Sequence, residues 1–163
     1  MKKIILIRHG KSAWDQPWLA DHDRPLAERG LNDVPKMAKR LKKKGIIPDV
    51  ILSSSALRAV DTAKITAEIL GFPEDDIVFE ENLYHASVST MLKYIHKQKD
   101  SKNVLFLIGH NPGLNELIAH LGGKIDNLAT SGQFGFQLDS DHWEEVLPKK
   151  VKAWFWDYPK KKA

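Results

Sequence analysis

Arginine and histidine side chains come soon after short apolar runs in this sequence. Arg8 and His9 follow the first run, and Arg58 lies a few residues after the second. His110 comes soon after the fourth run. A guanidinium group forms paired hydrogen bonds with the oxygens of a phosphoryl group, and a histidine nitrogen can attack phosphorus. These residue types therefore favour phosphoryl transfer, provided that the fold brings them together.

Each of these residues also has an ordinary structural explanation. Arg8 could be a surface arginine at a strand end, and His9 could be a turn histidine bonded to a backbone carbonyl. His110 could be a core histidine with satisfied hydrogen bonds, and Pro112 would then simply open the next helix. Arg58 is expected in the first turn of a helix, where the positive end of the dipole disfavours a cation. An anionic ligand would supply the missing compensation.

Glu81 is the fifth candidate, because it follows the third apolar run and would reach the same edge of a sheet. It could equally belong to an exposed acidic turn, since Asp75, Asp76 and Glu80 lie nearby in the sequence. The seven histidines contain no pair at the i, i+4 spacing of helical metal ligands. We therefore expect neither a metal nor another cofactor.

The four apolar runs are expected to be strands of a parallel sheet. They are residues 4–7, 50–52, 77–79 and 104–108, and successive apolar residues are typical of strands covered on both faces. Segments of helical spacing separate the runs, and this alternation indicates an α/β fold. Ligands of open α/β sheets bind beyond the carboxyl ends of the strands, which is where the candidate residues lie.

Four helices are expected where apolar residues recur at helical spacing. In chain order, these residues are Leu31, Val34, Met37, Ala38 and Leu41; Val60, Ala63, Ala67 and Leu70; Val88, Met91, Leu92 and Ile95; and Leu114, Leu117, Ile118 and Leu121. The first helix is expected to begin near Asn32, because Pro35 is tolerated in a first turn. Residues 133–138 and 152–156 are expected to be strands joined by a polar turn, with Trp154 and Trp156 on one face.

The composition indicates a globular protein and excludes several other classes. The chain has 163 residues, of which 42% are hydrophobic and 28% charged, and residues 1–163 are expected to form a single domain. The absence of cysteine excludes disulfides, thiolate metal sites and cysteine nucleophiles. The net charge of +4 is dispersed over lysine clusters without interleaved aromatic residues, so no nucleic acid partner is expected. No apolar run approaches the ~18 residues of a membrane span or resembles a signal peptide, so we expect a cytoplasmic protein without a membrane partner.

Five motifs carry a resemblance to a known family. They are Leu6-Ile7-Arg8-His9-Gly10-Lys11-Ser12; Asp23-Arg24-Pro25-Leu26 with Gly30; Leu52-Ser53-Ser54 with Arg58-Ala59 and Thr62-Ala63; Glu81-Asn82-Leu83-Tyr84; and Gly109-His110-Asn111-Pro112. Their order along about two thirds of the chain resembles that of the histidine phosphatase superfamily, which includes the cofactor-dependent phosphoglycerate mutases. Within the superfamily, the chain is similar to the short SixA-type phosphohistidine phosphatases. Gly10 departs from the short subfamily, where alanine is frequent.

The resemblance implies a three-layer α/β/α fold with a mainly parallel central sheet, like that of phosphoglycerate mutase. It also implies that His9 is the nucleophile and carries a phosphohistidine intermediate that water hydrolyses. Arg8, Arg58 and a partly protonated His110 would surround the phosphoryl oxygens and stabilise a loose transition state, so no metal is required. Glu81 matches the position at which many relatives carry the proton donor.

The short chain indicates a class of substrate. Only 28 residues lie between Glu81 and His110, which is enough for one helix and one strand but leaves little chain for a lid. An open site suits a phosphohistidine side chain presented by another protein, or a small phosphorylated substrate turned over slowly. The loop of residues 126–132 is expected to border the pocket. The alternatives are a small-molecule phosphate-ester phosphatase or mutase on the same scaffold, and a non-catalytic phosphate-binding or interaction module. The sequence makes no prediction about the oligomeric state.

Overall fold

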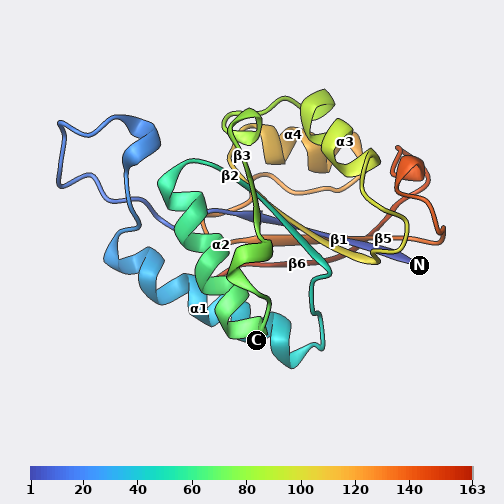
Figure 1. The fold of residues 1–163 in the computed structure, drawn as a ribbon, viewed down its shortest axis with the longest axis horizontal. Coiled ribbons are helices and arrows are strands. Elements are labelled where there is room, and N and C mark those ends of the chain that lie inside the picture. The colour runs from blue at the N-terminus through green and yellow to red at the C-terminus, as the bar shows by residue number, and fades with distance from the viewer. Residues whose placement is uncertain (163) are drawn as a thin grey trace.

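The strands form one six-stranded sheet that has helices on both faces (Figure 1). The computed structural model describes residues 1–162. The strands are β1 (Lys2–Arg8), β2 (Val50–Ser54), β3 (Val78–Glu80), β4 (Val104–Gly109), β5 (Gln133–Leu138) and β6 (Lys152–Asp157). Their order is β3-β2-β4-β1-β5-β6; β1 to β4 are parallel, and β5 is antiparallel to both β1 and β6. The predicted α/β fold with a mainly parallel sheet is confirmed.

Two pairs of helices cover the sheet and complete the three layers. The first pair is α1 (Glu28–Lys43) and α2 (Leu57–Leu70), which lie on one face, and the second pair is α3 (Val88–His96) and α4 (Gly113–His120), which lie on the other. Short 3₁₀ helices occupy Asp21–Asp23, Glu74–Asp76, Glu81–Leu83 and Trp143–Glu145. Within residues 1–162, no helix has the length and apolar character required to cross a membrane.

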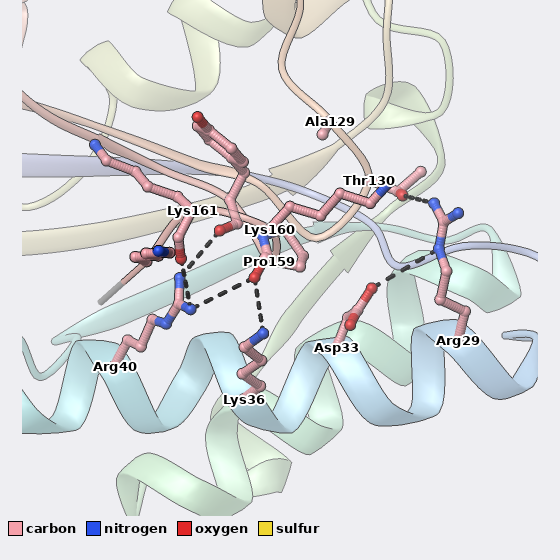
Figure 2. Close-up of a pocket in the computed structure, with 11 residues that line it drawn as sticks. Arg29, Asp33, Lys36, Arg40, Ala129, Thr130, Pro159, Lys160 and Lys161 are labelled. Carbon is pink, nitrogen blue, oxygen red and sulfur yellow. Dashed lines mark hydrogen bonds and ion pairs between the residues drawn. The ribbon is translucent and has the colours of Figure 1, made fainter.

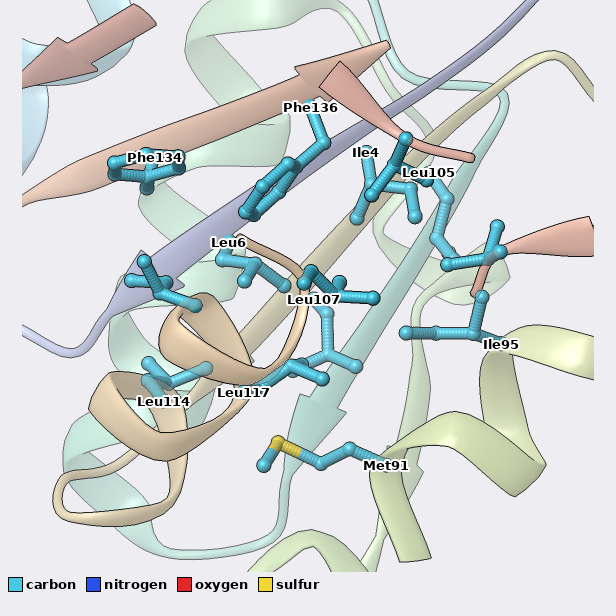
Figure 3. Packing of buried hydrophobic residues seen from close by; sticks show 14 of the residues in the cluster. Ile4, Leu6, Met91, Ile95, Leu105, Leu107, Leu114, Leu117, Phe134 and Phe136 are labelled. Carbon is cyan, nitrogen blue, oxygen red and sulfur yellow. The ribbon is translucent and has the colours of Figure 1, made fainter. Parts of the chain in front are cut away.

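The alternation of side chains along β1 divides the core between the two faces. Ile4 and Leu6 pack with α3 and α4, as Figure 3 shows, whereas Ile5 and Ile7 pack with α1 and α2. All four side chains are almost fully buried. Burial on both faces is therefore the reason why this strand is apolar at successive positions instead of alternating positions. The edge strand β3 differs, because Val78 is 40% exposed.

The register of the sheet brings the candidate residues to one edge. Arg8 at the end of β1 is paired with Gly109 at the end of β4, and Ser53 of β2 is paired with Ile108. Because these strands are parallel, the segments that follow them leave the sheet on the same side. His9, His110 and the start of α2 must therefore lie near one another.

The first helix begins earlier than the sequence predicts. It starts at Glu28 instead of near Asn32, which places Pro35 inside the helix. Proline cannot donate a hydrogen bond to the carbonyl one turn earlier, which belongs to Leu31. Leu31 is 53% exposed, so it faces away from the core instead of belonging to the apolar stripe. Packing of the buried face, which includes Val34 and Met37, outweighs the cost of the proline.

Gly10 and Gly30 allow the loop after β1 to approach α1 closely. A Cβ atom on Gly30 would lie 2.6 Å from the carbonyl oxygen of Lys11, and one on Gly10 would lie 2.7 Å from a methyl group of Val34. The Lys11 carbonyl also accepts a hydrogen bond from the Ala27 N–H at 2.8 Å. The glycine at position 10 therefore has a packing reason in this chain.

Substitution of Gly30 by alanine is expected to destabilise the protein by about 1–3 kcal/mol, because a backbone oxygen cannot move aside as a flexible side chain can. Urea denaturation followed by circular dichroism measures this change. Gly109→Ala is the matched control, since its Cβ would make only ordinary contacts at 3.7 Å. Equal stability of the two variants would show that the loop accommodates the added methyl group.

The carboxyl-terminal strands form where predicted, but Trp154 and Trp156 do not share a face. Trp154 packs with the core beneath α1 and α2, whereas Trp156 packs with the opposite core. The cause is a bulge: Gly135 is paired with Phe155, and the next residue of β5 is paired with Ala153. The extra residue reverses the alternation of side chains. The connection before β6 is also more than a polar turn, because it contains the fully buried Trp143.

Candidate active site

A pocket of about 210 Å³ lies at the carboxyl ends of β1, β2 and β4. It is lined by Arg8, His9, Lys11, Ser12, Trp14, Asp21, Arg58, His85, His110, Asn111 and Thr130. The fold thus brings together four of the five predicted site residues. His9, Arg58 and His110 are only 7%, 5% and 5% exposed. Thr130 belongs to the loop of residues 126–132, so the prediction that this loop borders the pocket is confirmed.

The hydrogen bonds of His9 identify its nucleophilic nitrogen. Nδ1 lies 2.7 Å from the carbonyl oxygen of Gly10. A carbonyl can only accept a hydrogen bond, so Nδ1 carries the proton and Nε2 keeps its lone pair. The Nε–H of Arg58 points at Nε2 from 3.4 Å, which is consistent with an accepting nitrogen there. Nε2 is therefore the atom that can attack phosphorus.

The surroundings of His9 keep the imidazole neutral. Burial lowers the pKa of His9 to about 4, the positive charges of Arg58 and Arg8 contribute in the same direction, and the hydrogen bond to Gly10 opposes them. A neutral imidazole has the lone pair that nucleophilic attack requires. His9 is thus in its reactive protonation state at neutral pH without the help of a separate base.

Thr62 and the start of α2 hold the loop that carries His9. The Gly10 N–H donates a hydrogen bond of 3.0 Å to Thr62 Oγ1, and that hydroxyl donates one of 2.7 Å to the Arg58 carbonyl. Arg58 is the second residue of α2, as the sequence predicts. The serines before α2 do not cap it with a side chain; the N-cap is Ala56. The nucleophile and the arginine opposite it are therefore linked through one hydroxyl group.

Arg58 is compensated by a carboxylate that the sequence reasoning missed. Its Nη2 lies 2.9 Å from Asp21 Oδ2, and its Nη1 donates to the Asp21 carbonyl at 2.7 Å. Hydrogen bonds from Tyr84 and Arg58 lower the pKa of Asp21. The sequence predicts that an anionic ligand compensates Arg58, but Asp21 already does so in this structure.

Arg8 is fixed from the opposite side of the pocket. Its Nη1 donates to the Leu128 carbonyl at 3.0 Å, while its buried Nε has no acceptor among residues 1–162. Asn111 donates to the same carbonyl at 2.9 Å, and its Oδ1 accepts the N–H of Asn115 at the start of α4. Burial and the nearby Arg58 lower the pKa of Arg8. A bound anion would offset the effects of burial and of Arg58 on the guanidinium charge. The unpaired Nε is therefore suited to a phosphoryl oxygen.

His110 lies beside His9, with ring centroids 4.9 Å apart. Its Nε2 is 2.7 Å from Ser54 Oγ, and its buried Nδ1 has no hydrogen-bond partner in the described part of the chain. Burial, followed by the charges of His9 and Arg58, lowers the pKa of His110 to about 2. His110 is therefore neutral while the pocket holds no anion. The expected protonated form requires a bound dianion, which favours the charged imidazole.

Glu81 is the predicted residue that the structure does not bring into the pocket. It begins the 3₁₀ helix after β3, its side chain is exposed, and it does not line the pocket. The same short segment instead contributes Tyr84, whose hydroxyl donates to Asp21, and His85, which lines the pocket. The role of Glu81 as proton donor stays a prediction.

Asp21 and His85 left only weak signals in the sequence. Asp21 lies in the irregular segment between β1 and α1, two residues before the motif that begins at Asp23. His85 directly follows the motif that ends at Tyr84 and adopts a positive φ of 53°. Proximity to these motifs was the only available indication, because Asp21 begins a 3₁₀ helix of only three residues and neither residue lies in a segment with apolar periodicity.

The described site offers phosphoryl chemistry through nitrogen and charge alone. His9 supplies the attacking atom, while Arg8, Arg58 and a protonated His110 can stabilise the negative charge on the equatorial oxygens. Within residues 1–162, no group of three or more histidine or carboxylate side chains is placed to hold a metal ion.

Turnover is expected to be unchanged within about twofold after dialysis against EDTA, because two arginines and a histidine replace the usual phosphate-bound cation. Initial rates before and after dialysis measure this. Vanadate, which mimics the five-coordinate phosphoryl group, is expected to inhibit in the presence of EDTA. Loss of activity that a divalent cation restores would contradict the prediction.

Comparison with known proteins places the chain in a family. Residues 4–94 match the model of the histidine phosphatase superfamily, branch 1. An uncharacterised chloroplast protein of Arabidopsis thaliana is 34% identical over 156 residues, which cover 90% of this chain and 71% of the relative. The chain belongs to the histidine phosphatase superfamily, and this membership supports phosphatase activity.

Two solved structures show the same fold over nearly their entire length. One, described as the phosphohistidine phosphatase SixA of Agrobacterium tumefaciens, has a TM-score of 0.81 and 25% identity and covers 97% of this chain and 99% of its own. The protein histidine phosphatase SixA complexed with tungstate has a TM-score of 0.83 and 24% identity, with 96% and 97% covered. A 2,3-bisphosphoglycerate-dependent phosphoglycerate mutase of Bifidobacterium longum matches only 71 residues at 35% identity, which are 40% of this chain and 28% of the mutase. The phosphoglycerate mutase-like fold and the similarity to SixA-type proteins are confirmed.

Proposed function

We propose that this protein removes the phosphoryl group from a phosphohistidine side chain of another protein. The observation that carries the proposal is a reactive imidazole in a pocket whose described residues include no carboxylic acid placed to protonate a leaving group. His9 Nε2 has a free lone pair, but Glu81 lies outside the pocket. The one carboxyl group in the pocket, that of Asp21, has a lowered pKa and is paired with Arg58. A carboxylate with a low pKa is a poor general acid at neutral pH.

The lack of a positioned carboxylic acid favours substrates whose leaving group needs little protonation. An alkoxide that leaves from a phosphate ester needs a proton from the enzyme, and loss of such an acid typically costs about 10²- to 10⁴-fold. Imidazole is a much better leaving group and departs from phosphohistidine with modest help. A pocket whose described residues include no positioned carboxylic acid is therefore better suited to a phosphorus–nitrogen bond than to a phosphate ester. The similarity to SixA proteins supports the same substrate class.

The reaction then runs in two displacements. His9 Nε2 attacks phosphorus, the bond from phosphorus to the substrate nitrogen breaks, and the substrate imidazole leaves and takes up a proton from solvent. Arg8 and Arg58 bind the equatorial oxygens in both steps. Water then attacks the phosphorylated His9, which releases inorganic phosphate and a proton and restores the neutral imidazole.

A small-molecule phosphatase or mutase is the second candidate function. The partial match to a phosphoglycerate mutase favours it. The family model also matches the segment that carries Arg8, His9 and Arg58. A non-catalytic phosphate-binding module is disfavoured, since phosphate binding alone does not require a lone pair on His9 Nε2. The pocket of about 210 Å³ is also smaller than the roughly 300–1,000 Å³ of ligand sites that enclose a whole small molecule.

A comparison of substrates tests the proposed function. Initial rates are measured with a histidine-phosphorylated protein, 3-phosphoglycerate and an alkyl phosphate, using wild type and Glu81→Gln. We expect kcat/KM to be at least about 10²-fold higher for the phosphohistidine protein. This is the lower end of the rate enhancement that protonation of a leaving group typically gives. A preference for either ester would reject the phosphohistidine assignment in favour of the second candidate.

The Glu81→Gln variant tests the proton donor separately. Because imidazole needs little protonation, dephosphorylation of phosphohistidine is expected to change by less than about threefold, whereas any residual ester hydrolysis should fall more if Glu81 moves to the leaving group. Asp76→Gln provides the control for loss of an exposed acidic residue in the same region. Equal and large losses on both substrates would show that Glu81 has a different function, such as orienting water.

A further inference from the structure

A second, larger groove lies between α1 and the carboxyl-terminal tail. It has a volume of about 590 Å³ and is shown in Figure 2. Six cationic side chains line it: Arg29, Lys36, Arg40, Lys160, Lys161 and Lys162. Within the described residues, Asp33 is the only carboxylate among the lining side chains. The groove is therefore strongly basic, although the positive charge of the chain as a whole is small.

The cations of the groove keep most of their charge uncompensated. Arg40 is paired with Asp157 at 2.9 Å, and Arg29 lies 3.8 Å from Asp33. In residues 1–162, none of the four lysines lies within ion-pair distance of a carboxylate. Lys36 donates to the Pro159 carbonyl at 2.7 Å (Figure 2), but a neutral acceptor satisfies the ammonium group without cancelling its charge. The groove therefore presents a net positive field to solvent.

Hydrogen bonds from α1 hold the carboxyl-terminal tail in place, so the shape of the groove is fixed by the fold. The Arg40 guanidinium donates to the carbonyls of Tyr158 at 3.0 Å and Lys161 at 2.8 Å. These bonds and the one from Lys36 fix the backbone of the tail against α1. The side chains of Lys160 and Lys162 make no hydrogen bond or ion pair within the described residues, and both are exposed. They are free to contact a ligand.

The groove is continuous with the catalytic pocket. Thr130 lines both, and its Oγ1 accepts a hydrogen bond of 3.1 Å from Arg29 Nη2. In Figure 2 the side chain of Lys160 extends from the tail toward Thr130. The catalytic pocket has about 210 Å³, so a protein-borne phosphoryl group must leave most of its carrier on the surrounding surface. The groove is nearly three times larger and begins at the pocket rim.

We propose that this groove binds an acidic segment of the protein whose phosphorylated side chain occupies the catalytic pocket. The proposal rests on the proposed function, since it names the property by which the partner is recognised. Mobile lysine side chains suit carboxylates of a flexible segment, because they need no fixed bidentate geometry. A nucleic acid fits less well, because Tyr158 is the only aromatic residue of the lining and single strands bind on several stacked aromatic rings. Recognition of this kind weakens as salt screens the charges.

Two synthetic peptides with one phosphorylated histidine provide the test. One carries glutamates on both sides of the histidine, and the other carries glutamines at the same positions. We expect kcat/KM to be about tenfold higher for the acidic peptide at low salt. The two values should converge in about 0.5 M NaCl, where the screening length is only a few ångströms. Turnover of the neutral peptide should depend less on salt, because only its phosphoryl group then contacts cationic side chains.

The double variant Lys160→Gln, Lys162→Gln removes two charges without breaking a hydrogen bond that holds the tail. It is expected to reduce the preference for the acidic peptide to about twofold or less and to leave the neutral peptide unaffected. Lys99→Gln, Lys102→Gln is the control with the same change of charge; both lysines are exposed and precede β4, at the end of the sheet opposite the pocket. The control should retain the full preference. An equal preference in the two double variants would overturn the proposal.

Binding of the unphosphorylated peptides, measured by fluorescence anisotropy, separates the groove from the catalytic function. Tighter binding of the acidic peptide that is lost in the groove variant supports the groove even if phosphohistidine is not hydrolysed, in which case the proposed function alone fails. Equal kcat/KM for both peptides with full phosphohistidine turnover overturns the groove and leaves the function intact. Tighter, groove-dependent binding of an oligonucleotide of the same charge would also overturn it, in favour of nucleic acid.

Discussion

Replacement of His9 by alanine is expected to abolish turnover, with a fall in kcat of about 10⁴-fold or more, as is typical for loss of a covalent nucleophile. The reason is that the lone pair aimed into the pocket beside Arg58 belongs to His9 Nε2, whereas His110 Nε2 is bonded to Ser54. Steady-state rates with a histidine-phosphorylated protein measure the effect. His120→Ala, at an exposed histidine at the end of α4, is the matched control and should retain full activity.

The same variant also tests the covalent intermediate. Wild-type protein mixed briefly with radiolabelled phosphohistidine substrate should carry a phosphoryl group on the peptide that contains His9, and the label should be acid-labile and alkali-stable. The alanine variant should not be labelled, but it should still bind vanadate, because Arg8, Arg58 and His110 remain. A fully active enzyme whose His9 peptide never acquires label would contradict the nucleophile assignment. A variant with a much lower melting temperature would have to be replaced by His9→Asn before the rates are interpreted.

The predicted residues that line the pocket share one property: they lie at or just after the end of a strand, or in the first turn of a helix. Arg8, His9 and His110 could be predicted because apolar runs identify parallel strands, and parallel strands deliver their carboxyl ends to one edge. Arg58 could be placed in the first turn of α2 because Gly71 and the apolar spacing delimit that helix. The sequence was therefore sufficient to place these four residues, whereas Glu81, which also follows a strand, does not line the pocket.

The features that were missed depend on contacts between distant segments. Asp21 reaches Arg58 from a three-residue 3₁₀ helix in the connection between β1 and α1, and no apolar periodicity in the sequence constrains where such a connection folds. The bulge that separates Trp154 from Trp156 inserts one residue into β6, which the alternation of residues cannot reveal. The groove requires the tail to lie against α1, more than a hundred residues away in the sequence, and the lysines there look like ordinary solvated charges until that contact is known.

Arg58 is expected to contribute mainly to the transition state, because its guanidinium lies next to the attacking nitrogen. Arg58→Ala should lower kcat by about 10³-fold, at the lower end of the range for arginines that stabilise phosphoryl transfer. KM should change much less, because Arg8 and His110 still bind the phosphoryl oxygens of the substrate. The ratio of the two effects is obtained from steady-state kinetics with a histidine-phosphorylated protein.

Arg58→Lys distinguishes geometry from charge. A lysine keeps the positive charge but provides a single point of contact, so it cannot direct one N–H at His9 Nε2 and a second pair at Asp21 or an incoming phosphoryl group. We expect it to recover no more than about tenfold of the loss seen with alanine, since one charge in place of a planar fork restores attraction without alignment. Asp21→Asn is the informative companion variant: it removes the carboxylate that competes for the fork and leaves Arg58 in place. If Arg58→Lys turned over at the wild-type rate, charge alone would explain the role of this residue, and the paired contacts seen around its guanidinium would be structural.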